Sequence, residues 1–193
     1  MSENQSPSTP SYDDFVRKLF NRTGDNSKDF AHAILGIVTE VHELLDATDE
    51  VNALEEVGDL AFYSQALDQV ITEIEGPCTR SDEQRIARLT EYAAKAQETH
   101  ISHVLAKLSA SLLDSAKRWI GYGKMPPSLR DTQEDAECFI ALVKNLRGSN
   151  FDADRVIKAN MAKLLKRYPG GEFDAYRAVV RDLEAERVVL QAS

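Results

Sequence analysis

The stretch TEVHELLDATDEVNALEEVGDL, residues 39–60, combines apolar side chains and carboxylates in a pattern that decides the fold. Apolar residues recur every three or four positions on both sides of the polar segment DATDE, 46–50, which predicts two amphipathic helices joined by a short turn. The wider segment 29–79 contains twelve carboxylates and neither Lys nor Arg. Because such helices must be largely packed, we expect their negative charge to be balanced by something else.

The same helical period runs through the rest of the chain, and no segment alternates convincingly as a strand would. Segments rich in Gly, Pro and polar residues separate the periodic stretches. The predicted helices are 12–22, 29–47, 50–75, 81–99, 100–121, 131–147, 153–167 and 174–190. We therefore expect an all-α helical bundle of one domain, residues 12–175, preceded by a flexible tail, 1–11, and followed by a C-terminal helix, 174–193.

A faint repeat links two parts of the chain. ELLDA, 43–47, is echoed by SLLDSA, 111–116, and LEEVGDLAFYSQAL, 54–67, by TQEDAECFIALVKNL, 132–146. The residues opposite Glu40, Glu43, Glu56 and Asp59 are then Leu108, Ser111, Glu134 and Glu137. This pattern predicts two degenerate halves, an acidic one at about 29–79 and a basic one at about 100–170, packed as a pseudo-dimer. Chance similarity between amphipathic helix pairs is the alternative.

Charge and composition limit the classes of partner. With 23 basic and 32 acidic residues, the net charge of −9 argues against a nucleic-acid polymer or an anionic membrane as the main partner. The 14 basic residues from Lys117 onward nevertheless outnumber the 11 acidic ones there. No apolar run approaches the roughly 20 residues that cross a bilayer. Two cysteines without a CxxC spacing and a polar N-terminus predict a reduced, cytoplasmic protein without a signal peptide.

Two pairs of carboxylates have the spacing of a metal site. Glu40 and Glu43 are three residues apart, as are Glu56 and Asp59, so each pair lies on one helix face. An antiparallel hairpin would bring the two pairs face to face, where four carboxylates repel one another. Mg²⁺ and Mn²⁺ take oxygen ligands, so we predict that one of them is held by these four residues. Two solvated acidic helix faces are the alternative.

At these residues the chain resembles a known family. EVHE, 40–43, and EVGD, 56–59, are similar to the E-x-x-E and E-x-x-D pairs of the all-α nucleoside triphosphate pyrophosphohydrolases of the MazG type, which are related to the dimeric dUTPases. KANMAKLLKRYPGGEF, 158–173, and KRWIGYGK, 117–124, resemble elements of phage-type members. The family often carries a further Glu directly before the first pair, where this chain has Thr39.

The resemblance implies Mg²⁺-dependent hydrolysis of nucleoside triphosphates to the monophosphate and pyrophosphate, with Mn²⁺ as a substitute and deoxynucleotide pool control as the role. It implies catalysis by Glu40 or Glu43, and the residues do not decide which of the two is the general base. The expected substrate-binding residues are Lys124, Asn160, Lys163, Arg167, Tyr168 and, for the base, Trp119. A homo-oligomer, dimer or tetramer, is expected as well. The preferred base and sugar are not encoded in any motif.

Other readings of a carboxylate-rich bundle fit less well. A di-iron protein needs Glu-x-x-His pairs, and none occurs here. An HD-type phosphohydrolase needs a His-Asp dipeptide, and a P-loop enzyme needs a Walker motif; both are absent from the sequence. A catalytically silent helical module that binds a nucleotide or a protein stays open. Metal-dependent release of pyrophosphate separates that module from an enzyme.

Overall fold

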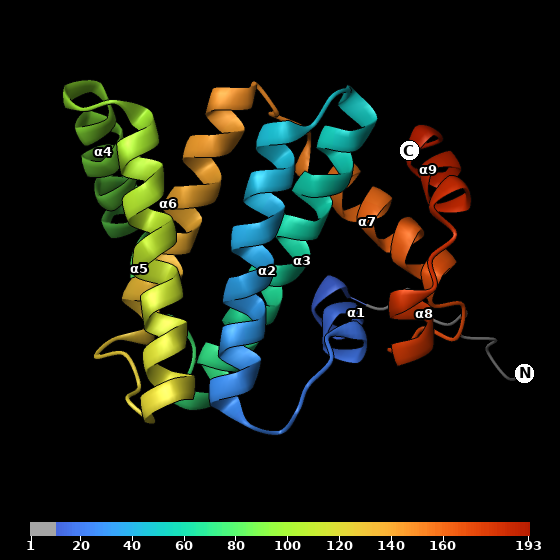
Figure 1. Cartoon of the computed structure of the whole chain (residues 1–193), viewed down its shortest axis with the longest axis horizontal. Coiled ribbons are helices and arrows are strands. Elements are labelled where there is room, and N and C mark those ends of the chain that lie inside the picture. Colours follow the sequence, from blue (N-terminus) through green and yellow to red (C-terminus); the bar gives the residue numbers. More distant parts are fainter. Residues whose placement is uncertain (1–10) are drawn as a thin grey trace, which may run out of the picture.

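The computed structural model describes residues 11–193, apart from the side chain of Asp82, and contains nine helices and no strand in this part of the chain (Figure 1). The predicted all-α helical bundle is therefore confirmed. The helices are α1 Tyr12–Leu19, α2 Asn26–Asp46, α3 Glu50–Glu75, α4 Asp82–Glu98, α5 Ile101–Tyr122, α6 Leu129–Arg147, α7 Ala153–Arg167, α8 Ala175–Val179 and α9 Leu183–Gln191.

Two predicted boundaries differ from the structure at the ends of the chain. The helix expected at 174–190 is interrupted, because Asp182 caps α9 by accepting a hydrogen bond from the Ala185 backbone N at 3.0 Å. The first helix ends at Leu19 and not at residue 22. Of the tail expected at 1–11, residues 1–10 lie outside the described part, and Ser11 is the N-cap of α1.

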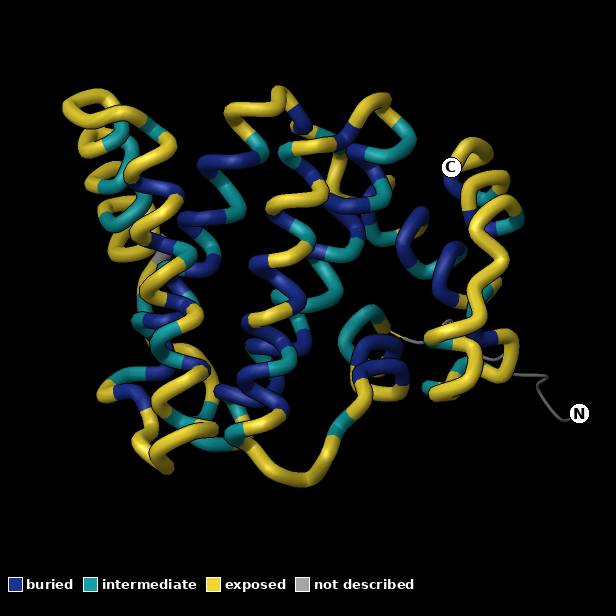
Figure 2. The backbone as a smooth tube through the Cα atoms, in the orientation of Figure 1, coloured by how far each residue is buried: buried dark blue, intermediate teal, exposed yellow. Residues whose placement is uncertain are grey.

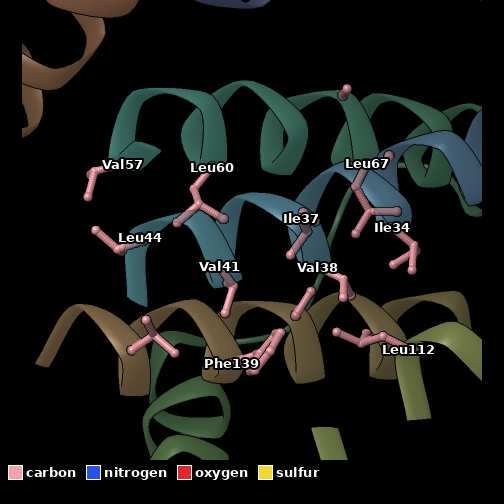
Figure 3. Packing of buried hydrophobic residues seen from close by; sticks show 14 of the residues in the cluster. Ile34, Ile37, Val38, Val41, Leu44, Val57, Leu60, Leu67, Leu112 and Phe139 are labelled. Carbon is pink, nitrogen blue, oxygen red and sulfur yellow. The ribbon is translucent and has the colours of Figure 1, made fainter. Parts of the chain in front are cut away.

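The core surrounds α2, which contacts α3, α5 and α6. Its apolar stripe is fully buried and packs against Leu60 and Leu67 of α3, Leu112 of α5 and Phe139 of α6 (Figure 3). The stripe consists of Ile34, Ile37, Val41 and Leu44. Burying a side chain of this size contributes about 1.5–3 kcal/mol, so this four-helix contact stabilises the fold.

The remaining helices lie on two sides of this core (Figure 1). On one side, α4 packs on α5 and α6, and its described side chains are half-buried or exposed (Figure 2). On the other side, α7 packs along α3, and both α1 and α9 contact α3 and α7. The acidic face of α3 is therefore covered by helices from both ends of the chain.

Two glycines allow close approaches around α3. A Cβ atom on Gly36 would lie 2.4 Å from the ring of Tyr63, so α2 needs glycine where that ring crosses it. A Cβ atom on Gly58 would lie 3.0 Å from Cβ of Asn160. The glycine in the sequence EEVGDL thus lets α7 pack directly on α3.

Both predicted halves contribute a helix pair to the core, α2 with α3 and α5 with α6. Their common origin and the domain boundaries stay predictions, because packing in one core does not require a duplication. Within residues 11–193, no helix combines the length and apolar character needed to cross a bilayer.

Candidate metal centre

The turn between α2 and α3 places three carboxylates together. Asp49 caps α3 by accepting a hydrogen bond from the Asn52 backbone N at 2.9 Å, so the chain reverses within a few residues. One carboxylate oxygen from each of Glu40, Glu43 and Glu56 then lies within 4.8 Å of the others. The two halves of the quoted stretch therefore meet at one point, as the spacing predicts.

These three carboxylates have no ion-pair partner among the described residues. Glu56 is 5% exposed and accepts a hydrogen bond from Asn52 Nδ2 at 2.6 Å. Burial, followed by the charges of Asp59, Glu43 and Glu56, raises the pKa of Glu40 to about 9. Burial, followed by the neighbouring carboxylates, raises the pKa of Glu56 to about 7. In the metal-free protein the ionised forms of Glu40 and Glu56 are therefore disfavoured, and Glu40 is protonated at neutral pH.

The geometry and donor type fit a small divalent cation. At Mg–O distances of about 2.1 Å, an octahedral shell separates neighbouring oxygens by about 3 Å and opposite ones by about 4.2 Å. Oxygens already within 4.8 Å reach such positions with small side-chain rotations. Three protein ligands leave positions for water and phosphate oxygens, which Mg²⁺ usually keeps. A cation here would also favour the ionised carboxylates, against the burial and the repulsion that raise the two pKa values.

Asp59, the fourth predicted ligand, is held by α7. Its Oδ2 accepts a hydrogen bond from Lys163 Nζ at 2.5 Å, and its Oδ1 accepts one from Asn160 Nδ2 at 2.9 Å. Lys163 is fully buried and also lies 3.4 Å from a carboxylate oxygen of Glu55. Asn160 is buried as well, and it accepts a hydrogen bond from the Tyr12 hydroxyl at 3.1 Å. Both expected substrate-binding residues thus contact Asp59 in this structure.

The three carboxylates open onto a pocket of about 380 Å³, which Asp59 and Glu55 also line. Away from the carboxylates the lining is mostly aromatic and apolar. Phe20 stacks on His32 with ring centroids 4.6 Å apart, and burial lowers the pKa of His32, so the uncharged ring is favoured at neutral pH. The rest of the pocket lining consists of Leu19, Asn21, Phe62, Tyr63, Leu164, Tyr168, Phe173 and Ala178, together with Arg167 and Arg181.

The other predicted binding residues divide into two groups. Arg167 and the buried Tyr168 line the pocket. Lys124 and Trp119 are not part of its lining; the Trp119 ring packs 5.1 Å from the ring of Phe30. The basic and aromatic segment 117–124, at the C-terminal end of α5, therefore does not line this pocket.

Sequence reasoning missed several pocket residues. Tyr63 follows Asp59 by four positions, so helical periodicity could have placed it on the same face. Glu55 is adjacent to Glu56, and its pairing with Lys163 depends on the approach of α7. Arg181 carries no local signal, because it lies between two short helices far along the chain.

The structure also shows how most of the acidic segment is neutralised. Seven of the twelve carboxylates in 29–79 pair with Lys or Arg from outside the segment, namely Asp29, Asp49, Glu50, Glu55, Asp59, Asp68 and Glu73. Basic side chains from outside the segment therefore neutralise most of its negative charge. Of the five remaining carboxylates, Glu40, Glu43 and Glu56 are the three that cluster.

Comparison with protein-family models, curated proteins and solved structures finds no match to this chain. The relation to the MazG-type enzymes therefore rests on the quoted motifs alone. The helical fold agrees with that resemblance at the level of fold class.

Proposed function

We propose that this protein hydrolyses nucleoside triphosphates to the monophosphate and pyrophosphate with Mg²⁺ bound by Glu40, Glu43 and Glu56. The observation that carries the proposal is the cluster of these three carboxylates, without an ion-pair partner among the described residues, in a pocket that is also lined by aromatic side chains. A triphosphate with its metal needs the first feature, and a nucleobase suits the second.

The residues of the pocket have separable roles in this reaction. A bound Mg²⁺ would supply charge neutralisation on the triphosphate and a lowered pKa for the attacking water. Glu43 is exposed whereas Glu40 is half-buried, so Glu43 is the first-helix carboxylate that best reaches solvent and can accept a proton. Lys163 and Asn160 fix the orientation of Asp59, whose carboxylate faces the same pocket.

The pocket size is suited to a mononucleotide. Ligand pockets of about 300–1,000 Å³ hold molecules of this class, and the volume of about 380 Å³ lies within that range. Phe20, His32 and Phe62 offer flat faces for a base. A role in the deoxynucleotide pool and a homo-oligomeric state follow from the motif resemblance and belong to the same proposal.

The test is a panel of ribo- and deoxynucleoside triphosphates incubated with Mg²⁺, with the products separated by chromatography. We expect monophosphate and pyrophosphate, no reaction in chelator, and recovery on adding Mg²⁺ or Mn²⁺. Formation of diphosphate and orthophosphate would contradict attack at the α-phosphorus. Binding of nucleotide without any hydrolysis would identify the protein as the catalytically silent module.

A further inference from the structure

We propose that Arg181, in the segment between α8 and α9, binds the outer phosphates of the substrate, and that Glu186 of α9 positions it together with Arg167. The inference rests on the proposed function, because it assigns a polyphosphate to the same pocket. It adds a part of the chain that the motifs do not include. The C-terminal segment 175–191 would then complete the binding site and not only cover the fold.

The two arginines share one buried carboxylate. Arg167 donates from Nε to Glu186 Oε1 at 3.0 Å and from a terminal nitrogen to Oε2 at 2.6 Å. Arg181 donates to the same Oε2 at 2.7 Å. Glu186 is only 2% exposed. Burial alone would raise the pKa of Glu186, but the two arginines lower it to about 2, so the carboxylate stays ionised at neutral pH.

This arrangement leaves donors for a ligand. Both guanidinium groups share the carboxylate of Glu186, and Arg181 has a second, longer contact with Glu55. The hydrogen bonds of Arg181 to Glu186 and, at 3.4 Å, to Glu55 both start from the same terminal nitrogen. Arg167 binds Glu186 through Nε and one terminal nitrogen only. Each guanidinium therefore keeps N–H groups for phosphate oxygens, which its planar fork suits.

The position of the two guanidiniums fits a metal-bound polyphosphate. Arg167 and Arg181 line the same pocket as the three clustered glutamates. A triphosphate carries more negative charge than one divalent ion neutralises, and charge-assisted hydrogen bonds from arginine are the usual complement. Lys163, which also belongs to α7, is fully buried against Asp59 and Glu55. The outer phosphates are thus better served by Arg181 than by Lys163.

A neighbouring arginine provides a matched control. Arg187 of α9 also pairs with a carboxylate of the acidic half, Asp49, at 2.7 Å. Unlike Arg181, it does not line the pocket, and its partner Asp49 is exposed whereas Glu186 is buried. If the arginines only fasten the C-terminal segment to the bundle, removing either one should have similar effects. If Arg181 binds phosphate, only the removal of Arg181 should weaken the binding of the ligand.

The experiment compares wild type, Arg181→Ala and Arg187→Ala by calorimetric titration of inorganic tripolyphosphate with Mg²⁺, and by steady-state kinetics with the best nucleotide. We expect Arg181→Ala to weaken tripolyphosphate binding about tenfold or more and to raise KM similarly, with a much smaller change in kcat. Arg187→Ala should match wild type. Guanidinium ions at low concentration should restore part of the affinity of Arg181→Ala. Equal behaviour of both variants, or no restoration, would overturn the inference.

The role of Glu186 is tested with Glu186→Gln, which keeps the shape and removes the charge. We expect KM to rise severalfold, and the double variant Arg181→Ala/Glu186→Gln to show less than the product of the two single effects, because both act on one guanidinium. Independent effects would contradict a positioning role. A wild type that binds tripolyphosphate through Arg181 yet hydrolyses no nucleotide would contradict the proposed function alone. Normal hydrolysis by the wild type, with the tripolyphosphate affinity and the KM unchanged in Arg181→Ala, would contradict this inference alone.

Discussion

The helices α3 and α6 carry carboxylates at the same spacing in opposite surroundings. In α3, Glu56 lies beside Glu40 and Glu43 and has no ion-pair partner among the described residues. In α6, Glu134 binds Arg80 at 2.5 Å and lies 3.5 Å from Arg88. Three residues further along α6, Glu137 binds Arg85 at 2.8 Å. On α3 the clustered Glu56 therefore has no basic partner among the described residues, whereas the acidic face of α6 is neutralised by arginines in and just before α4.

This difference shows that an i,i+3 carboxylate pair is not a metal site by itself. Each pair is equally able to face one point, and the neighbouring segment decides whether basic side chains occupy that point. The segment with Arg80, Arg85 and Arg88 does so for α6. On α3, Asp59 pairs with Lys163 of α7, whereas Glu56 clusters with Glu40 and Glu43.

The largest expected difference between the two faces is in catalysis. Glu56→Gln should lower kcat by about a hundredfold or more, because a lost metal ligand removes several kcal/mol of transition-state stabilisation. Glu134→Gln, at the aligned position of α6, should leave kcat within about twofold of wild type. Both are measured by pyrophosphate release at saturating Mg²⁺, with circular dichroism as the check on folding. Equal losses would remove the distinction between the faces.

A large effect on stability is expected for the buried cation of α7. Lys163→Met leaves Asp59 and Glu55 without their shared ammonium group, and breaking a buried pair in this way costs about 3–5 kcal/mol. The melting temperature should fall by about 6–15 °C, and adding Asp59→Asn should restore part of it. Arg155→Met, at an exposed pair with Glu50, should cost less than about 1 kcal/mol. An unchanged melting temperature with a raised KM would instead favour direct phosphate binding by Lys163.

The fold and the carboxylate cluster could be predicted from local sequence, but the charge balance could not. The period of Ile34, Ile37 and Val41 is set within one helix, so it predicts the buried face directly. The absence of Lys and Arg from 29–79 indicates a charge problem, yet the partners lie far away in the chain. Arg130 reaches Asp68 across 62 positions, and only the packed bundle brings them together.

The break between α8 and α9 illustrates the same limit. Residues 174–190 read as one amphipathic helix, and Asp182 within it could equally be a surface residue of that helix or the cap of a new one. The structure shows the second arrangement, and it places Arg181 in the pocket. A pocket residue that depends on such a break has no sequence pattern of its own.

The two faces should also respond oppositely to loss of charge in the metal-free protein. The folded-state pKa of Glu40 is about 9, above its unfolded value of 4.5, so the folded state binds more protons and stability falls as pH rises through this window. Glu40→Gln should therefore raise the melting temperature by a few degrees at pH 8 in chelator, and by less at pH 5. Glu134→Gln should lower the free energy of unfolding by about 1–3 kcal/mol, because Arg80 and Arg88 each lose one of their carboxylate partners. A destabilised Glu40→Gln protein at pH 8 would show that the cluster is not under electrostatic strain.

The smallest expected effects test the backbone beneath the two faces. Gly58 of α3 aligns with Ala136 of α6, which is 2% exposed. Ala136→Gly should cost about 1 kcal/mol through helix propensity and leave kcat unchanged. Gly58→Ala gains a similar propensity term, but the new Cβ would lie 3.0 Å from Cβ and 3.2 Å from Nδ2 of Asn160, which must then shift away from Asp59. Stability should therefore change by less than about 1 kcal/mol while kcat falls severalfold, since a displacement of this size affects the orientation of a pocket carboxylate. Thermal unfolding and pyrophosphate release on the same samples separate the two effects. If Gly58→Ala were more stable and fully active, the close approach of α7 would have no part in shaping the acidic face of α3.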